Sequence, residues 1–180
     1  MTRRVPFVAV LLAAALTVPA LSDGAGRGKQ PEYYLGYSGT HWPQDYNVMA
    51  GHCDREAIAS FADPRAGMLS TRSPRDNRAA ATLIGASVDE LLGSSLGREI
   101  DDADRACLGH VLEIGRSGHR VVWDNAATGV HFEMVPDDGH SWVAGVCRDF
   151  KLAARSSSGK SKRHATACQH GAGLWQLSQL

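Results

Sequence analysis

The sequence predicts an α+β domain in which one or two amphipathic helices pack on a four- to five-stranded antiparallel β-meander, stapled by disulfides. Three observations lead to this fold class. Apolar residues recur at steps of three and four between residues 78 and 114, which is typical of an amphipathic helix. Beyond Gly118 they recur at every second residue, as in half-buried strands. Four cysteines follow a leader-like N-terminus, which favours two disulfides in an exported protein.

Residues 1–22 have the features of a signal peptide. Arg3 and Arg4 form a basic start, residues 7–18 form an apolar run, and small residues precede the expected cleavage between Ser22 and Asp23. The run is shorter than the roughly 20 apolar residues of a spanning helix. No cysteine follows it that would accept a lipid, and we expect no transmembrane helix in the mature chain. An uncleaved N-terminal anchor is the alternative.

Residues 23–50 are predicted to form a flexible, aromatic-rich segment. Residues 23–31 are rich in glycine and polar residues, a composition typical of linkers. Five aromatic side chains follow within 14 positions: Tyr33, Tyr34, Tyr37, Trp42 and Tyr46. Such a stretch can stack on a partner or on carbohydrate, or it can pack over its own domain.

Residues 51–115 are predicted to be a helical region. A short helix is expected from Cys53 to Phe61, and a longer helical pattern runs from Arg78 to Ile114. One unbroken helix of that length would measure about 45 Å, at about 1.5 Å per residue, which is long for this domain. We therefore expect a break near Gly97, and Gly115 would end the second helix.

Residues 116–180 are predicted to be the β-rich part. The expected strands cover residues 120–124, 130–134, 142–155, 162–168 and 174–177, with turns at 126–129, 136–139 and 156–159. Much of the core is expected from Trp123, Phe132, Met134, Trp142, Val146 and Trp175.

The hairpin register predicts the cysteine pairs. A turn centred on residues 157–158 would place Cys147 opposite Cys168, and opposite residues of an antiparallel pair lie about 4.5–5.5 Å apart, which suits a disulfide. By elimination, Cys53 would bond Cys107 and tie the N-terminal segment to the second helix. Free thiols, or pairing with another subunit, are the alternatives.

Charge excludes one class of partner. The leader holds two of the 19 basic residues and none of the 19 acidic ones, so the mature chain is slightly acidic. Nucleic acid is therefore not an expected partner, because phosphate binding needs clustered Lys and Arg. The last hairpin alone is basic, through Arg148, Lys151, Arg155, Lys160, Lys162 and Arg163. These side chains could meet anionic lipid headgroups or other envelope polymers, or form a solvated face that prevents edge pairing.

Three glycines suggest helix packing. Gly85, Gly93 and Gly97 share a four-residue register, with Asp89 at the missing position. Small residues at this spacing let helices approach closely. We interpret the row as a degenerate glycine zipper, and Asp89 and Glu90 argue against a membrane helix.

The order of short motifs around this glycine row is similar to that in a known protein family. Cys53-Asp-Arg-Glu56 precedes it, and Leu96 to Cys107 (LGREIDDADRAC) follows. The β-rich part then contains Val122-Trp-Asp-Asn125, Cys147-Arg-Asp149 and Ala165-Thr-Ala-Cys168. In this order, over about residues 52–178, the chain resembles the bacterial seventeen-kilodalton surface antigen family of glycine-zipper envelope proteins.

The resemblance implies a location in or at the outer membrane, a glycine-zipper segment followed by a small β-rich surface antigen domain, and no catalytic residues. This chain lacks the lipidation cysteine of some members. Its glycine row is interrupted by Asp63, Pro64, Arg65, Asp89 and Glu90. A soluble periplasmic or peripherally attached form is therefore expected.

Four patterns in the sequence could indicate a chemical function. Gly93-Ser-Ser-Leu-Gly97 matches a nucleophile motif, but it lies inside a helical pattern rather than after a strand. His52-Cys53 would need a free thiolate. Asp101, Asp102 and Asp104 could act as an acid–base cluster, although capping of a helix start explains them.

Histidines are the remaining candidates for a chemical function, as ligands of a metal ion. His164, Cys168 and His170 lie close together in the sequence, and His119, His131 and His140 could share a face of the sheet. Zinc needs four such donors, and a disulfide at Cys168 would remove its thiolate. We expect no catalytic, cofactor or metal residues.

The sequence therefore favours a non-catalytic cell-envelope or surface antigen-like structural protein, located in the periplasm or at the outer membrane of a Gram-negative envelope. Its possible partners are an envelope protein or the outer membrane itself. The alternative is a soluble periplasmic binding or inhibitor module that presents residues 33–46 or one face of the sheet.

Overall fold

The computed structural model describes residues 34–60, 80–85, 87–142 and 145–178, which belong to one compact unit. The predicted signal peptide, residues 1–22, lies outside the described residues. So do Tyr33 and the part of the predicted glycine zipper that contains Asp63, Pro64 and Arg65.

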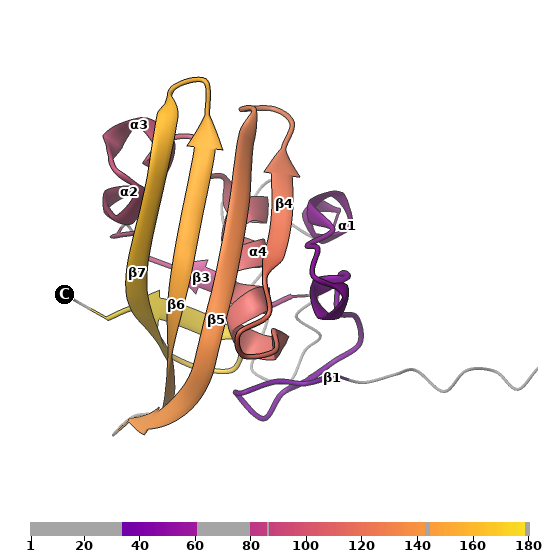
Figure 1. The fold of residues 1–180 in the computed structure, drawn as a ribbon. Coiled ribbons are helices and arrows are strands. Elements are labelled where there is room, and N and C mark those ends of the chain that lie inside the picture. The colour runs from indigo at the N-terminus through magenta and orange to yellow at the C-terminus, as the bar shows by residue number, and fades with distance from the viewer. Residues whose placement is uncertain (1–33, 61–79, 86, 143–144, 179–180) are drawn as a thin grey trace, which may run out of the picture. The chain divides into compact units, whose positions relative to one another are not determined.

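A six-stranded mixed sheet forms the frame of this unit, in the order β3-β8-β7-β6-β5-β4. Strands β4 to β8 pair antiparallel with their neighbours, whereas β3 pairs parallel to β8. The sheet curls around one face of helix α4, which spans Asp102–Ile114 (Figure 1). The strands are β3 (Thr82–Ile84), β4 (Val121–Asn125), β5 (Val130–Trp142), β6 (Gly145–Ser156), β7 (Gly159–Gln169) and β8 (Leu174–Leu177).

Apart from α4, the remaining elements are short. They are β1 (Tyr34–Leu35), which pairs with β2 (His41–Trp42), the 3-10 turn η1 (Val48–Ala50), α1 (Arg55–Ala59), α2 (Ser87–Leu92) and α3 (Ser94–Gly97). Of these, η1 and α1 pack on α4, whereas α2 and α3 pack on β7. Helix α4 buries 11 of its 13 residues, so it is the centre of the core rather than a helix laid on one surface.

The predicted fold class is wrong. The described part of the chain is mostly β, with 44% of its residues in strands and 24% in helices, and the main sheet has six strands in a mixed arrangement instead of four or five in an antiparallel meander. Thr82 to Ile84, which continue the helical spacing in the sequence, form β3. They do so because Leu83 pairs with Trp175 of β8 and the Thr82 amide donates to the Gly173 carbonyl, 2.9 Å away.

The glycine row does not line one helix face. Gly85 follows β3 with φ +98°, Gly93 separates α2 from α3 with φ +89°, and Gly97 ends α3. The positive φ values explain why the first two are glycines, since other residues rarely adopt this conformation. The break near Gly97 and the helix end at Gly115 are as predicted, and Asp101 caps α4 in a reciprocal capping box with Asp104.

The strand predictions were right at the last hairpin and wrong at one turn. Ser156 pairs with Gly159, so the register follows the predicted turn at residues 157–158. The turn expected at 136–139 is instead a β-bulge, because Pro136 and Gly139 still pair with Phe150 and Arg148 of β6.

Part of the predicted flexible segment contributes to the core. Trp42 is 1% exposed and Tyr46 is 4% exposed, and Val48 is also buried. Of the predicted core, Trp123, Phe132, Met134 and Trp175 are fully buried and Val146 is half-buried, while the Trp142 side chain lies outside the description. Burying large aromatic surface is a strong driving force, so residues 34–50 pack onto α4.

Gly109 tests the close approach of α4 to β3. A β-carbon at Gly109 would overlap the backbone of Thr82, so Gly109→Ala must push β3 from the helix. We expect a loss of about 3 kcal/mol or more in the free energy of unfolding, measured with urea. Gly118→Ala is the control, because φ is +70° there but nothing lies within 4 Å, so only about 1 kcal/mol should be lost. Equal losses would contradict the packing described.

Candidate binding site

Both disulfides join the pairs that the sequence favoured. Cys53 is bonded to Cys107 of α4, and Cys147 of β6 is bonded to Cys168 of β7, with a Cα–Cα separation of 5.9 Å in the first pair and 3.9 Å in the second. No cysteine is free. A disulfide sulfur is neither a nucleophile nor a thiolate ligand, so His52-Cys53 has no reactive thiol and Cys168 cannot bind zinc through one.

The other chemical motifs are also structural. Gly93-Ser-Ser-Leu-Gly97 spans the start and end of α3 and follows helix α2, so the strand that a nucleophile elbow requires is missing from it. In the part of the chain that the structure describes, no three His, Cys, Asp or Glu side chains come together to hold a metal ion. His131 instead pairs with Asp124, at 2.7 Å.

The carboxylates at the start of α4 hold other segments in place. The fully buried Asp104 carboxylate accepts from Trp123 Nε1 at 3.1 Å, Asn125 Nδ2 at 2.7 Å and Arg55 Nε at 3.0 Å. Arg55 also pairs with Asp101. Burial is the main cause that raises the pKa of Asp104, and the hydrogen bond from Asn125 opposes it. Asp102 is exposed in the first turn, where an acid favours the helix dipole.

His110 lies fully buried in the middle of α4. Its Nδ1 accepts from the Ala81 amide at 3.3 Å, so its Nε2 carries the proton and donates to the Gln44 carbonyl at 3.0 Å. The rings of Trp42 and Tyr46 meet its ring edge to face, at centroid distances of 5.4 Å and 5.2 Å. Burial lowers the pKa of His110 to about 4, so the imidazole is neutral at pH 7.

Two buried charges lie at the C-terminal end of α4. Glu113 accepts from Trp175 Nε1 at 2.8 Å and from the Ser38 amide at 3.0 Å. Arg148, predicted to lie on the basic surface of the hairpin, is instead fully buried. It donates to the Leu112 carbonyl at 2.7 Å, and its guanidinium carbon lies 4.1 Å from the centre of the Tyr37 ring. A cation suits this end because the last helical carbonyls are unpaired and negative.

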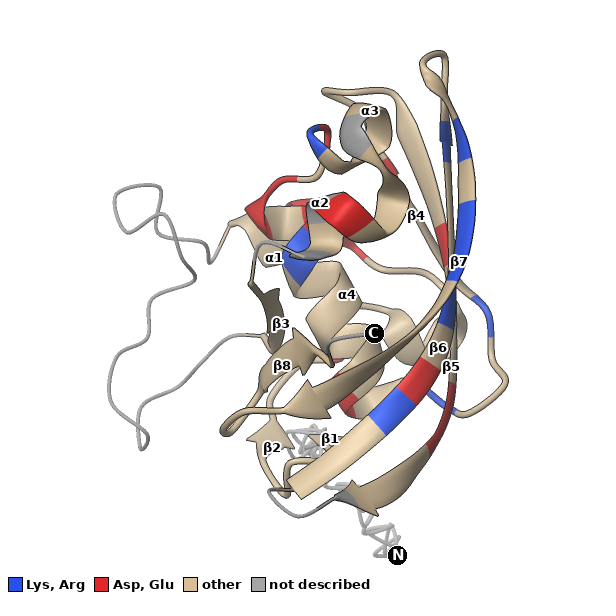
Figure 2. Cartoon of the chain, turned by 90° about the vertical axis from the view of Figure 1, so that its left-hand side faces the viewer, with Lys and Arg blue, Asp and Glu red and all other residues tan. Residues whose placement is uncertain are grey.

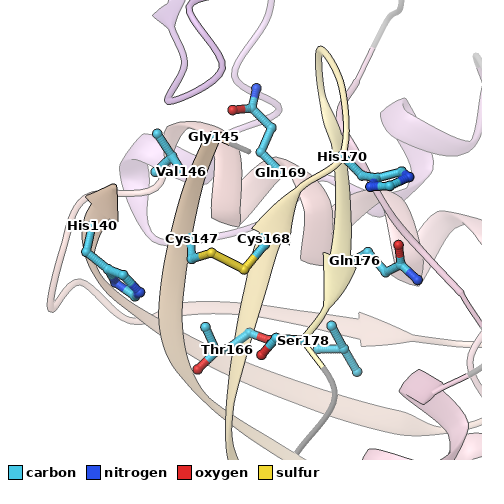
Figure 3. A pocket seen from close by; sticks show the side chains of 11 residues that line it. His140, Gly145, Val146, Cys147, Thr166, Cys168, Gln169, His170, Gln176 and Ser178 are labelled. Carbon is cyan, nitrogen blue, oxygen red and sulfur yellow. A yellow bond between two sulfur atoms is a disulfide. The ribbon is translucent and has the colours of Figure 1, made fainter. Parts of the chain in front are cut away.

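The hollow on the outer face of the sheet is different from these buried clusters. It has a volume of about 520 Å³ and lies over the Cys147–Cys168 disulfide (Figure 3). His140, Cys147, Cys168 and Gln176 form one row across β5, β6, β7 and β8. We call it the disulfide hollow, and it is lined by His140, Gly145, Val146, Cys147, Thr166, Cys168, Gln169, His170, Gln176, Leu177 and Ser178.

The lining of the disulfide hollow offers groups that can form hydrogen bonds. Gln176 offers an amide, and Thr166 and Ser178 offer hydroxyls, on the same face as the disulfide. Amides and hydroxyls both donate and accept hydrogen bonds. The volume falls in the range of about 300–1,000 Å³ that is usual for small-ligand sites. Such a surface can bind a neutral, hydroxyl- or amide-bearing group.

Sequence reasoning found only part of this site. Cys147, Cys168, His140 and His170 were considered, but as disulfide or metal residues. The amide and hydroxyl residues were missed because they become neighbours only when four strands assemble. Extending the predicted register from Cys147 and Cys168 to Asp149 and Thr166 would have placed the latter beside the disulfide.

Among the residues described, no helix combines the length and the apolar character that crossing a membrane requires. Comparison of the chain with protein-family models, with curated proteins and with solved structures finds no match.

His110 predicts an acid-labile fold. Its pKa is about 4 in the folded chain and 6.5 ordinarily, so the unfolded chain binds a proton first as the pH falls. Stability contributed by the neutral imidazole is complete above pH 6.5 and is lost towards pH 4, by about 3 kcal/mol. Urea unfolding at a series of pH values measures this loss.

The matched variant is His110→Gln, whose amide can donate and accept like the neutral imidazole but does not titrate. The stability difference between the wild type and this variant should shrink, or change sign, by about 3 kcal/mol between pH 7 and pH 4. Parallel profiles would show that His110 is not the titrating group.

Proposed function

We propose that this protein is a non-catalytic cell-envelope protein, similar to surface antigens, that acts by contact through the outer face of its sheet. One observation carries the proposal. The buried ionisable side chains, Asp104, His110, Glu113 and Arg148, are engaged by neighbouring segments, and none of them lines the disulfide hollow. The accessible hollow presents an amide, hydroxyls and a disulfide instead.

An envelope location is supported by three features. The leader-like residues 1–22 predict export, the two disulfides suit an oxidising compartment, and the order of motifs is similar to that of the surface antigen family. The glycine row has no part in the proposal, because Gly85, Gly93 and Gly97 do not share a helix. We place the protein in the periplasm or peripherally at the outer membrane of a Gram-negative cell.

A soluble periplasmic binding or inhibitor module is the second candidate, and the disulfide hollow favours it. Residues 34–46 are not a free docking arm, because Trp42 and Tyr46 are buried against His110. The binding surface of such a module would be the outer face of the sheet. The two candidates therefore share one surface and differ in what contacts it.

Site-specific crosslinking in intact cells tests this proposal. A photo-reactive residue replaces Gln176, which is exposed in the disulfide hollow, and the matched control replaces Gln44, which is also exposed but lies outside it. We expect a discrete adduct from position 176 and none from position 44. An adduct with an outer-membrane component supports the envelope protein, and one with a soluble periplasmic protein supports the binding module. No adduct at 176, or the same adduct at both positions, contradicts both.

A further inference from the structure

The outer face of the sheet carries a second hollow, separate from the disulfide hollow. It has a volume of about 510 Å³, and we call it the basic hollow. Two rows of the ladder cross it, one made by His131, Arg155 and Lys160 and the next by Glu133, Ala153 and Lys162. The small Ala153 side chain lies between longer charged neighbours, so it forms the floor.

Positive charge is concentrated at this end of the chain. The β6–β7 hairpin holds six basic residues and a single acid, Asp149, although the whole chain has 19 of each sign. Figure 2 shows Lys and Arg in blue along β6 and β7. Arg148 is buried, but Lys151, Arg155, Lys160, Lys162 and Arg163 are exposed. The acid nearest the floor, Glu133, is paired with Arg120 at 3.3 Å, which partly neutralises it.

The two hollows lie on one face along the same strands. Arg155 and Cys147 are eight residues apart on β6, which corresponds to about 27 Å at about 3.4 Å per residue. Asp149 lies between them and accepts a hydrogen bond from Thr166. An elongated ligand that follows the strands would therefore meet cations at one end and an amide and hydroxyls at the other.

The side chains of this face indicate which class of elongated anion it could bind. Among the described residues, the large exposed apolar side chains are Leu35 and Tyr37, and neither lines a hollow. The described side chains of the two hollows therefore include no tyrosine, phenylalanine or tryptophan on which nucleic-acid bases stack, and no large exposed apolar anchor that inserts into a bilayer. Hydroxyl groups fit the disulfide hollow, and carboxylate, sulfate or phosphate groups fit the basic hollow.

We infer that the outer face binds a linear anionic polysaccharide, with its charged groups in the basic hollow and its hydroxyl-bearing sugars in the disulfide hollow. This inference rests on the proposed function and names the ligand class of the same face. Binding is largely electrostatic, so it weakens as salt rises, because each cation releases counterions from the polymer.

The test uses the full oxidised protein and heparin-derived oligosaccharides as the anionic probe, with uncharged dextran as the reference. Lys160→Gln/Lys162→Gln should weaken binding of a long oligosaccharide about tenfold and make its affinity less dependent on salt. Arg116→Gln removes an exposed charge outside both hollows and should change binding less than twofold. Equal losses in both proteins would overturn the inference.

Substitutions of Ala153, the floor of the basic hollow, and of Asp149, the acid between the two hollows, test the inference further. Ala153→Glu places a carboxylate in the basic hollow and should weaken binding more than tenfold, whereas Ala153→Gln, of equal size and uncharged, should weaken it much less. Asp149→Asn removes the acid between the hollows and should strengthen binding about threefold. Circular dichroism and the thermal midpoint of each variant verify that it is folded. Similar effects of Glu and Gln at position 153 would contradict an electrostatic site.

The length of the ligand tests whether both hollows act together. Gln176→Ala should weaken binding of the long oligosaccharide about threefold and leave binding of a disaccharide unchanged. Vesicles of phosphatidylglycerol are the competing surface, and binding to vesicles without binding to oligosaccharide would replace the inferred ligand by an anionic membrane. A specific adduct at position 176 together with no oligosaccharide binding would overturn this inference and leave the proposed function standing.

Discussion

Hydrogen bonds to three ionisable side chains buried along α4 hold together segments that lie far apart in the sequence. Asp104 accepts hydrogen bonds from side chains of α1 and β4. His110 donates to the Gln44 carbonyl and accepts from the Ala81 amide next to β3. Glu113 accepts from Ser38 and from a side chain of β8. Removing such groups from water is unfavourable unless their partners are in place. Each segment therefore depends on the others, and the unit is expected to fold cooperatively.

The two faces of the sheet around α4 differ, because one packs in the core and the other is exposed. On β6 the side chains of Phe150, Leu152 and Ala154 point to the core, and those of Lys151 and Arg155 are exposed. The Cys147–Cys168 disulfide links β6 to β7 under the first hollow, while Cys53–Cys107 links the chain before α1 to α4. Such covalent links restrict the unfolded chain and stabilise the fold.

Local patterns in the sequence were enough to predict some features. The turn at residues 157–158 set the register that pairs Cys147 with Cys168, and the acidic start of α4 and Gly115 marked its ends. Features that depend on contacts between residues far apart in the chain could not be predicted from the sequence. β3 has three residues and forms a strand because β8 lies beside it. Arg148 lies on the same face of β6 as Phe150, but its charge led to the prediction that it is exposed. The disulfide hollow needs four assembled strands, so no single motif could reveal it.

Native-state hydrogen exchange followed by mass spectrometry tests the central role of α4 most directly. If its buried side chains hold residues 34–50 to the sheet, amides of η1, α4 and the central strands β5 and β6 should exchange through one common opening, with similar free energies. Rapid exchange throughout residues 34–50 while β5 and β6 remain protected would contradict this account, because the N-terminal segment would then be an attachment that the fold does not need.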